Sequence, residues 1–247
     1  MTTFDGNRNL THQVTYELGR AIVQGKYKVG DHFPTEAQMC QHYRISRSVV
    51  REAVKMLTAK GLISSRPRQG IRVLPPSAWN VFDVDVLQWT LTGRPSLELL
   101  REFNELRSTV EPEAAALAAR HQSPEAIEAI GRALERVRLA GQGEDDPLEA
   151  NIEFHTSILL ASNNRFFIQL RNFIQTALRV STACSSQLLD AVVGRYGDHK
   201  SIFDAISEGD ARAAQSGMSA LLGESCRQVA GIVELRAANS AGLAAIS

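Results

Sequence analysis

Residues 43–73, with the sequence YRISRSVVREAVKMLTAKGLISSRPRQGIRV, decide the fold of the N-terminal part of this chain. Ser46 is a favourable N-cap residue, and apolar side chains recur after it at helical spacing until Gly61 supplies a stop. Two β-prone runs, residues 62–64 and 71–74, then flank a basic turn. The stretch therefore predicts a helix followed by a β-hairpin.

Two more helices are predicted upstream of this stretch. Residues 10–23 place apolar side chains at helical spacing and end shortly before Gly25. Thr35 and Gln38 have the spacing of a capping box, which predicts a second helix that continues to about His42. Three short helices followed by a hairpin wing indicate a winged helix-turn-helix, which is a DNA-binding fold.

Charge is distributed unevenly along the chain, although its formal net charge is zero. Residues 1–78 hold 12 Lys and Arg against 5 Asp and Glu, a net charge of +7, and the remaining residues hold 15 against 22, a net charge of −7. A basic N-terminal third favours a polyanionic partner, because each neutralised phosphate releases condensed counterions. The acidic remainder is not expected to bind DNA itself.

The predicted third helix carries the side chains that a recognition helix needs in the major groove. Its first turns hold short polar and cationic residues, and Arg47 and Arg51 project from one face because they are four positions apart. The wing could reach the DNA backbone or the minor groove, where Gly70 permits a close approach. The alternative is a solvated basic face of an ordinary helix. The candidate DNA-binding residues are Thr35, Glu36, Ser46, Arg47, Ser48, Arg51, Arg66, Arg68, Gln69 and Gly70.

Beyond the wing, the sequence predicts a linker and then a helical domain. Two prolines follow the second strand, so a DNA-binding domain over residues 8–76 and a linker over residues 77–95 are expected. About six helical segments without strand-like alternation follow, which predicts an all-α bundle over residues 96–236 and a tail over residues 237–247. The predicted fold class is mainly α, with an N-terminal winged helix-turn-helix and a C-terminal helical bundle.

Composition argues against several classes of protein. A chain of 247 residues is long enough for two domains with sizeable cores. No run approaches the ~18 apolar residues of a membrane span, and the N-terminus lacks a signal-peptide pattern, so a cytoplasmic protein is expected. Cys40, Cys184 and Cys226 are widely spaced and form no CxxC, so neither a disulfide framework nor a thiolate metal site is expected.

Two histidines are predicted to face the interior of the bundle. His155 lies on the apolar stripe of its helix with Asn151 four positions before it, and His199 lies on the apolar face of a later helix. Either histidine alone is compatible with a hydrogen-bonded core residue. Together with Asn151 they favour a polar pocket for a small ligand.

A permanently charged side chain is also directed towards the core. Arg107 lies on an apolar helix stripe, so its guanidinium needs an anion. That anion could be Glu111 one turn later, or it could be the carboxylate of a small ligand. A polar stripe of another helix, formed by Arg171, Gln175, Arg179 and Thr182, could add contacts to ligand hydroxyls, with a solvated face as the alternative for Arg171. The candidate effector-binding residues are Arg107, Asn151, His155, Gln175, Arg179 and His199.

Residues 29–73, VGDHFPTEAQMCQHYRISRSVVREAVKMLTAKGLISSRPRQGIRV, closely resemble the winged-helix head of the GntR family. Ala37 departs from the family pattern, because relatives often have an Arg there that contacts DNA. That contact is therefore not expected in this chain. The residues that match the family pattern are Gly30, Pro34, Glu36, Ser46, Arg47, Arg51, Glu52, Leu57, Gly61 and Gly70.

The C-terminal part resembles the FCD ligand-binding domain of the FadR subfamily. The phrases that carry this resemblance are ELRSTVEPEAAALAA from Glu105, NIEFHTSILLASNN from Asn151 and DHKSIFDAISEGDARAAQSGM from Asp198. The linker phrase WNVFDVDVLQW is similar to that of regulators of sugar-acid catabolism. The resemblance implies a repressor that binds a palindromic operator as a homodimer and responds to a small carboxylate effector, such as an aldonate or uronate.

The same resemblance raises the question of a metal. Many family members bind a divalent cation, such as Zn²⁺ or Ni²⁺, through one Asp and three His. This chain has Asn151 and Leu221 at two of those four positions, which leaves His155 and His199. Losing the anionic ligand and one imidazole weakens such a site, so Asn151, His155 and His199 are expected to form a poor metal site.

Two rival functions remain open from the sequence. The first is a small helical enzyme that uses His155 and His199, although no nucleophile with a paired base, phosphate loop or complete metal motif is present. The second is an architectural DNA-binding protein that senses no ligand. Trp79 and Trp89 in the linker either transmit a ligand signal between head and bundle or simply fill apolar gaps.

Overall fold

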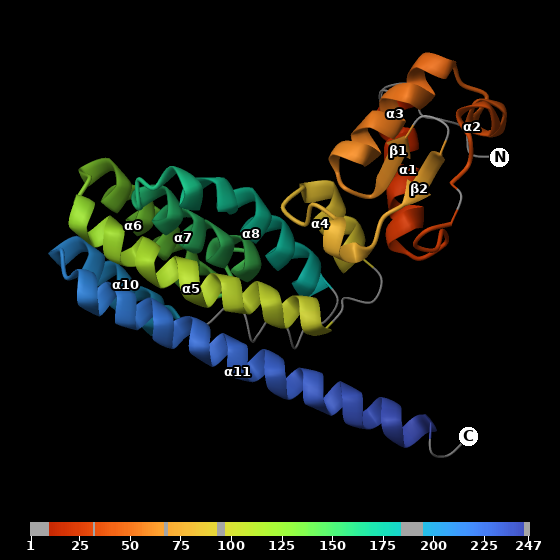
Figure 1. The fold of residues 1–247 in the computed structure, drawn as a ribbon. Helices are drawn as coiled ribbons and strands as arrows, with labels where there is room; N and C mark the ends of the chain where they lie inside the picture. The colour runs from red at the N-terminus through yellow and green to blue at the C-terminus, as the bar shows by residue number, and fades with distance from the viewer. Residues whose placement is uncertain (1–9, 32, 67–68, 93–96, 184–194, 245–247) are drawn as a thin grey trace. The chain divides into compact units, whose positions relative to one another are not determined.

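The computed structural model describes residues 10–31, 33–66, 69–92, 97–183 and 195–244. The chain forms two compact units, Met1–Gly93 and Arg94–Ser247. Figure 1 shows the helices and strands of each unit, and each unit is considered separately below. None of the described helices combines the length and apolar character that a bilayer-spanning helix requires.

The N-terminal unit contains the predicted winged helix-turn-helix. Three helices, α1 (Leu10–Val23), α2 (Glu36–Tyr43) and α3 (Arg47–Ala59), precede the wing. The wing is an antiparallel pair of strands, β1 (Ile63–Arg66) and β2 (Gly70–Val73). The fold class predicted for this part of the chain is confirmed.

Local capping fixes where the second and third helices begin. The Oγ1 atom of Thr35 accepts a hydrogen bond from the backbone N–H of Gln38, and Oε1 of Gln38 accepts one from the backbone N–H of Thr35. Ser46 caps α3 in the same way, because its Oγ accepts from the backbone N–H of Val49 at 3.4 Å. The capping box and the N-cap serine predicted from sequence are therefore confirmed.

Apolar faces of the three helices and the wing form the core of this unit. The stripe of α3 points inward, and alternate residues of β2 are buried while the residues between them are exposed. This packing leaves the polar face of α3 towards solvent. The core includes Val14, Leu18, Ile22, Val50, Val54, Leu57, Ile63, Ile71 and Val73.

The segment expected to be a linker contains ordered structure that belongs to the head. A 3₁₀ turn, η1 (Pro76–Ala78), is followed by the helix α4 (Val84–Leu91), which packs against α1. Trp89 is part of the head core and is only 2% exposed. Trp79 packs against the same core, so both tryptophans fill apolar gaps in the head.

The C-terminal unit is the predicted all-α bundle. Its long helix α5 (Leu97–His121) packs against α11 (Ala211–Ala244), α7 (Pro147–Ala161), α10 (Tyr196–Glu208) and α8 (Arg165–Ala183). Figure 1 shows α11 running alongside α5. α6 (Pro124–Ala140) packs on α7 and α10. Because α5, α7 and α10 contact one another or a shared neighbour, polar side chains on their inner faces meet inside the bundle.

Candidate functional site

The exposed face of α3 presents the polar side chains predicted for DNA recognition. Arg47, Ser48 and Arg51 are exposed, while Val50 and the rest of the apolar stripe are buried. The hydroxyls of Ser46 and Ser48 lie 2.8 Å apart and form a hydrogen bond at the start of the helix. A helix with cations and hydroxyls on its first turns and a buried opposite face is suited to the major groove.

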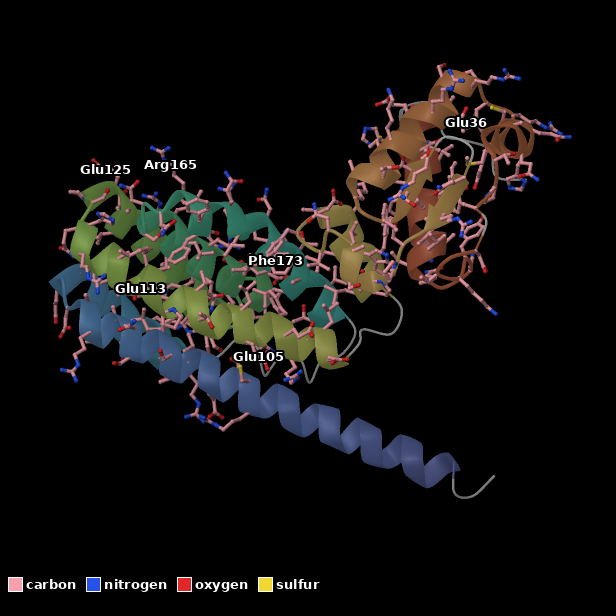
Figure 2. The ribbon with its side chains drawn as sticks, viewed as in Figure 1. Glu36, Glu105, Glu113, Glu125, Arg165 and Phe173 are labelled. Carbon is pink, nitrogen blue, oxygen red and sulfur yellow. The ribbon has the colours of Figure 1, made fainter. Side chains whose placement is uncertain are left out.

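Arg51 is positioned by an acidic residue from the neighbouring helix. Its Nε donates to Oε2 of Glu36 at 3.1 Å, and both side chains are exposed. Glu36 projects from the first turn of α2, where Figure 2 labels it. A carboxylate at this surface would repel phosphates, so its contact with Arg51 is better suited to orienting the guanidinium than to touching DNA.

The wing supplies a second group of candidate DNA contacts. Arg66, Gln69 and Gly70 are exposed, and Gly70 has a positive φ of 74°. Thr35 uses its hydroxyl in the capping box at the start of α2. An open depression of about 600 Å³ lies between that helix start and the wing. Arg68 lies outside the described residues.

Five charged or polar side chains form a buried cluster inside the bundle. Arg107 and Glu111 come from α5, Asn151 and His155 from α7, and His199 from α10. Each is at most 1% exposed. The sequence predicted four of these side chains to face the interior, and the packing of α5, α7 and α10 places them together.

The carboxylate of Glu111 joins Arg107 and His155 in this cluster. Nε of Arg107 donates to its Oε1 at 2.6 Å, and Nδ1 of His155 donates to its Oε2 at 2.5 Å. Burial raises the pKa of the Glu111 carboxyl, but Arg107 and His155 outweigh that effect and lower the pKa to about 2. Glu111 is therefore ionised at neutral pH, and the pairing of Arg107 with Glu111 left open by the sequence is present.

His199 forms the uncharged side of the cluster. Burial and the nearby His155 lower the pKa of its imidazole to about 4, so the ring is neutral at pH 7. Its Nδ1–H donates to the carbonyl oxygen of Arg195 at 2.8 Å, which makes Nε2 an acceptor.

The amide of Asn151 is next to that acceptor. Its Oδ1 faces Nε2 of His199 at 3.1 Å, and its Nδ2 has no partner among the described residues. Turning the amide by 180° gives Nε2 the donor it requires, because amide oxygen and nitrogen are assigned from their hydrogen bonds. The other end of the amide is then available to a ligand.

One edge of the Arg107 guanidinium is also without a partner. Nε and Nη2 contact Glu111, whereas the buried Nη1 has no hydrogen-bond partner within the described part of the chain. A buried N–H of a charged group without an acceptor costs free energy, and a carboxylate or hydroxyl oxygen would remove that cost. Arg107 and Asn151 thus offer two polar groups to a small anionic, hydroxylated molecule.

Two other predicted effector residues lie in more open surroundings. Arg179 is exposed, and its Nε and Nη2 donate to the two carboxylate oxygens of Glu149 at 2.7 and 2.8 Å. Gln175 is only partly buried. The guanidinium of Arg179 therefore forms a surface ion pair with Glu149 of α7, and within the described residues its hydrogen bonds do not reach the buried cluster.

The residues of the cluster do not fit a metal site of the kind that the family resemblance implies. Within the described ranges, no group of three or more His, Cys, Asp and Glu side chains could hold a metal ion. Nδ1 of His155 is used by Glu111, and the anionic ligand expected at position 151 is a neutral amide. Leu221 supplies no ligand atom at the fourth position.

Sequence reasoning missed the bridging position of Glu111 between Arg107 and His155, because only the packing of α5 on α7 creates it. It also missed an ion cluster in the head, in which the buried Lys60 pairs with the partly exposed Asp83 and Asp85. Only a weak signal in the sequence pointed to this ion cluster, because Asp83 precedes the apolar run of α4 at an N-cap position. A lysine at the end of α3 gave no sign that it is buried.

A winged helix-turn-helix joined to a helical bundle with an enclosed polar cluster defines the class of transcription regulators that have separate DNA-binding and ligand-binding domains. The chain belongs to the GntR family of bacterial regulatory proteins. The model of that family matches residues 10–73, and the FCD domain model matches residues 102–224.

Characterised relatives support the assignment over most of the chain. It is 32% identical to the galactonate operon transcriptional repressor of Escherichia coli over 90% of this chain and 97% of that protein. It is 31% identical to the Uxu operon transcriptional regulator of the same organism over 80% of this chain and 77% of that protein. These relatives are transcription regulators and not enzymes.

A solved structure supports the fold. The Listeria monocytogenes protein Lar, described as controlling expression of the agr system, matches with a TM-score of 0.57 at 18% identity. The match covers 92% of this chain and 98% of that one. At this identity the similarity shows the fold alone.

Proposed function

We propose that this protein represses genes of sugar-acid catabolism and releases its operator when an aldonate or uronate binds in the bundle. The proposal rests on the buried guanidinium of Arg107, which has one edge without an acceptor and lies in a cluster with an amide and a neutral imidazole. A sugar acid carries the matching groups, a carboxylate for Arg107 and a hydroxyl for the free end of the Asn151 amide. Two relatives named for the galactonate and Uxu operons support the same class of effector.

The enclosure of the cluster suggests how binding changes the protein. Arg107 is 1% exposed, so a ligand reaches it only if the side chains that cover it move. A ligand that binds only the rearranged bundle shifts the population towards that form. Release of DNA then requires that the liganded form disfavours the arrangement of two heads that fits the operator.

On the DNA side, we propose that α3 reads base edges through Arg47 and Arg51 and that the wing contacts the backbone. A single head buries little surface, so a homodimer on a palindromic operator is expected to supply the required affinity. We assign residues 8–93 to the DNA-binding unit, because α4 shares the core of the head.

The proposed contacts do not include a metal ion. The amide of Asn151 and the guanidinium of Arg107 would contact the sugar acid directly. Effector binding is therefore expected to survive treatment with EDTA. A response that depends on added Zn²⁺ or Ni²⁺ would contradict this part of the proposal.

Thermal shift and DNA binding with a panel of acids test the proposal. Galactonate, gluconate and glucuronate are compared with uncharged galactose, and the DNA is a duplex selected from a randomised library by the wild-type chain. We expect one acid to raise the melting temperature and to weaken DNA binding at least tenfold, while galactose has no effect.

Arg107→Lys is the matched variant, because it keeps a cation beside Glu111 but loses the forked guanidinium. It should bind the duplex normally and no longer respond to the acid. Release of DNA by Arg107→Lys at the wild-type acid concentration would refute the role of Arg107. No response of the wild type to any aldonate or uronate would refute the effector class.

A further inference from the structure

A buried ammonium group connects the end of the recognition helix to the start of α4. Lys60 is the C-cap residue of α3 and is 8% exposed. Its Nζ donates to both carboxylate oxygens of Asp83 at 2.7 and 2.8 Å and to Oδ2 of Asp85 at 2.8 Å. One ammonium is therefore bound by two carboxylates from a segment 23 to 25 residues further along the chain.

Asp83 performs a second task with the same carboxylate. It is the N-cap residue of α4, and its Oδ1 accepts from the backbone N–H groups of Asp85 and Val86. The carboxylate that caps the start of α4 is thus the one that binds the C-cap residue of α3. A shift of the α4 N-terminus relative to α3 must break or stretch these contacts.

The backbone reinforces this connection. The carbonyl oxygen of Lys60 accepts from the N–H of Asn80 at 3.0 Å. Gly61, with a φ of 74°, approaches the carbonyl oxygen of Ala78 so closely that a Cβ would lie 2.2 Å from it. The corner between α3 and β1 therefore has no room to slide against the segment that leads into α4.

Trp89 holds the other side of α4. Its ring lies against Gly19 of α1, and it makes an edge contact with Tyr16 at a centroid distance of 5.6 Å. The ammonium of Lys60 lies 5.7 Å from the centroid of the same ring. α4 is consequently held against α1 by the packing of Trp89 and against the end of α3 by the ion pairs of Lys60.

The charges favour a persistent contact at neutral pH. Burial lowers the pKa of the Lys60 ammonium, but its hydrogen bonds with Asp83 and Asp85 outweigh that effect and raise the pKa. Lys60 is therefore protonated wherever the protein is folded near pH 7. Removing its charge would leave two carboxylates close together without a cation, and their repulsion would loosen the start of α4.

We propose that Lys60, Asp83 and Asp85 are positioning residues that couple α4 to the recognition helix. Through them, DNA contacts on α3 restrain α4, and a displacement of α4 is passed to the last turn of α3. Because linkage is reciprocal, the effect of DNA binding on α4 and the effect of an α4 displacement on DNA binding have the same coupling free energy. The DNA contacts of α3 and the extension of this coupling to a sugar-acid signal both rest on the proposed function.

Hydrogen exchange of the full chain, with and without the selected DNA duplex, tests the coupling without any effector. Lys60→Met removes the charge and keeps most of the apolar stem. Lys55→Met is the matched control, because Lys55 is on the same helix but is 74% exposed and pairs only with Glu52 within the described contacts. Asp85→Asn is a milder variant that leaves the Asp83 cap in place.

In the wild type and Lys55→Met, we expect the duplex to slow exchange several-fold in both α3 and α4. In Lys60→Met the slowing should persist in α3 and be lost in α4, and Asp85→Asn should show a partial loss. If Lys60→Met fails to fold, Asp85→Asn alone decides the test. Full slowing of α4 in the variants, or none in the wild type, would overturn the proposal. No sugar acid is present, so failure of the proposed effector leaves the result unaffected.

Discussion

Nδ1 of His155 donates to Oε2 of Glu111 at 2.5 Å, and both side chains are 1% exposed. Arg107 binds the other oxygen of the same carboxylate, so one buried anion is shared by α5 and α7. The buried carboxylate of Glu111 is stable in its charged form only while Arg107 and His155 remain bound to it. The cluster therefore links the stability of the bundle to the same side chains that we propose bind the effector.

Loss of Arg107 should destabilise the bundle strongly. Arg107→Met leaves the Glu111 carboxylate buried without its guanidinium partner, and breaking a buried ion pair from one side costs about 3–5 kcal/mol. Arg107→Met with Glu111→Gln should recover most of that loss, because the neutral amide still accepts from His155. Urea denaturation gives the free energies of unfolding.

The control for this series lies on the same helix. Arg101 and Glu105 form an ion pair at 2.9 Å, with side chains 65% and 59% exposed. Arg101→Met should change the free energy of unfolding by about 0.5 kcal/mol or less, because exposed pairs are screened by water. A similar loss for Arg101→Met and Arg107→Met would show that burial of the Arg107 pair is unimportant.

The stability of the bundle should fall in acid in two successive ranges. The folded pKa of His199 is about 4, below its usual 6.5, so unfolded chains bind this proton more readily and stability is lost as the pH falls from 6.5 to 4. The difference between the folded and unfolded pKa of His199 corresponds to at most about 3 kcal/mol of folding free energy. Glu111, with its pKa lowered from 4.5 to about 2, adds a second loss between pH 4.5 and 2.

Denaturation between pH 7.5 and 4 separates His199 from the other histidines. His199→Gln should flatten the dependence between pH 6.5 and 4, whereas His121→Gln, at the exposed end of α5, should keep the wild-type slope. The groups facing His199 are the rings of Phe154 and His155, the amide of Asn151 and the carbonyl of Arg195. An unchanged slope in His199→Gln would mean that His199 is not the buried neutral group.

The parts of this protein that follow from local sequence were predictable. The Thr35 capping box, the Ser46 cap and the stop at Gly61 depend on residues close together in the chain, and each is present. The inward direction of Arg107 and His155 also followed from helical spacing. Helix periodicity predicts on which face of a helix a side chain lies, so the inward direction of these two residues could be predicted.

Partners from distant segments were not predictable. Whether Arg107 meets Glu111 or a ligand depends on the room left by α7, and Arg179 turned out to pair with Glu149 on a neighbouring helix. The helix signal of α4 is weak, because the helix has only eight residues and two aspartates stand around its start. α4 is buried because its Trp89 ring lies against Gly19 of α1, and this contact exists only in the folded head.

The recognition helix should tolerate little change at its exposed arginines. Arg47→Ala and Arg51→Ala should each weaken binding of the selected duplex by about 1–3 kcal/mol if they read base edges. Arg66→Ala in the wing should mainly reduce the salt dependence, because a phosphate contact releases counterions. Fluorescence anisotropy over a salt series distinguishes the two classes, and unchanged affinity in both α3 variants would exclude α3 as the recognition helix.

Glu36 offers a different test of the same surface. Glu36→Gln removes the 3.1 Å ion pair that orients Arg51 and also removes a negative charge near the DNA. We expect weaker discrimination between the selected duplex and random DNA, together with equal or stronger binding to random DNA. A parallel loss of affinity for both duplexes would instead indicate a role of Glu36 in folding of the head.

The contact between Gly19 and Trp89 gives the last prediction. An alanine normally stabilises a helix interior by about 1 kcal/mol relative to glycine. At position 19, however, a Cβ would lie 2.2 Å from the Trp89 ring, which is 2% exposed and cannot move without opening the head core. Gly19→Ala should therefore destabilise the head, by about 1–3 kcal/mol, as overpacked cores do.

Gly131 on α6 is the matched control, because a Cβ there would lie 3.4 Å from the Phe203 ring, at ordinary contact distance. Gly131→Ala should leave the bundle as stable or slightly more stable, and calorimetric unfolding reports both changes. Combining Gly19→Ala with Trp89→Leu should give less than the sum of the two single losses, because the smaller side chain leaves room for the methyl group. Additive losses would mean that the two residues do not contact each other in the folded head.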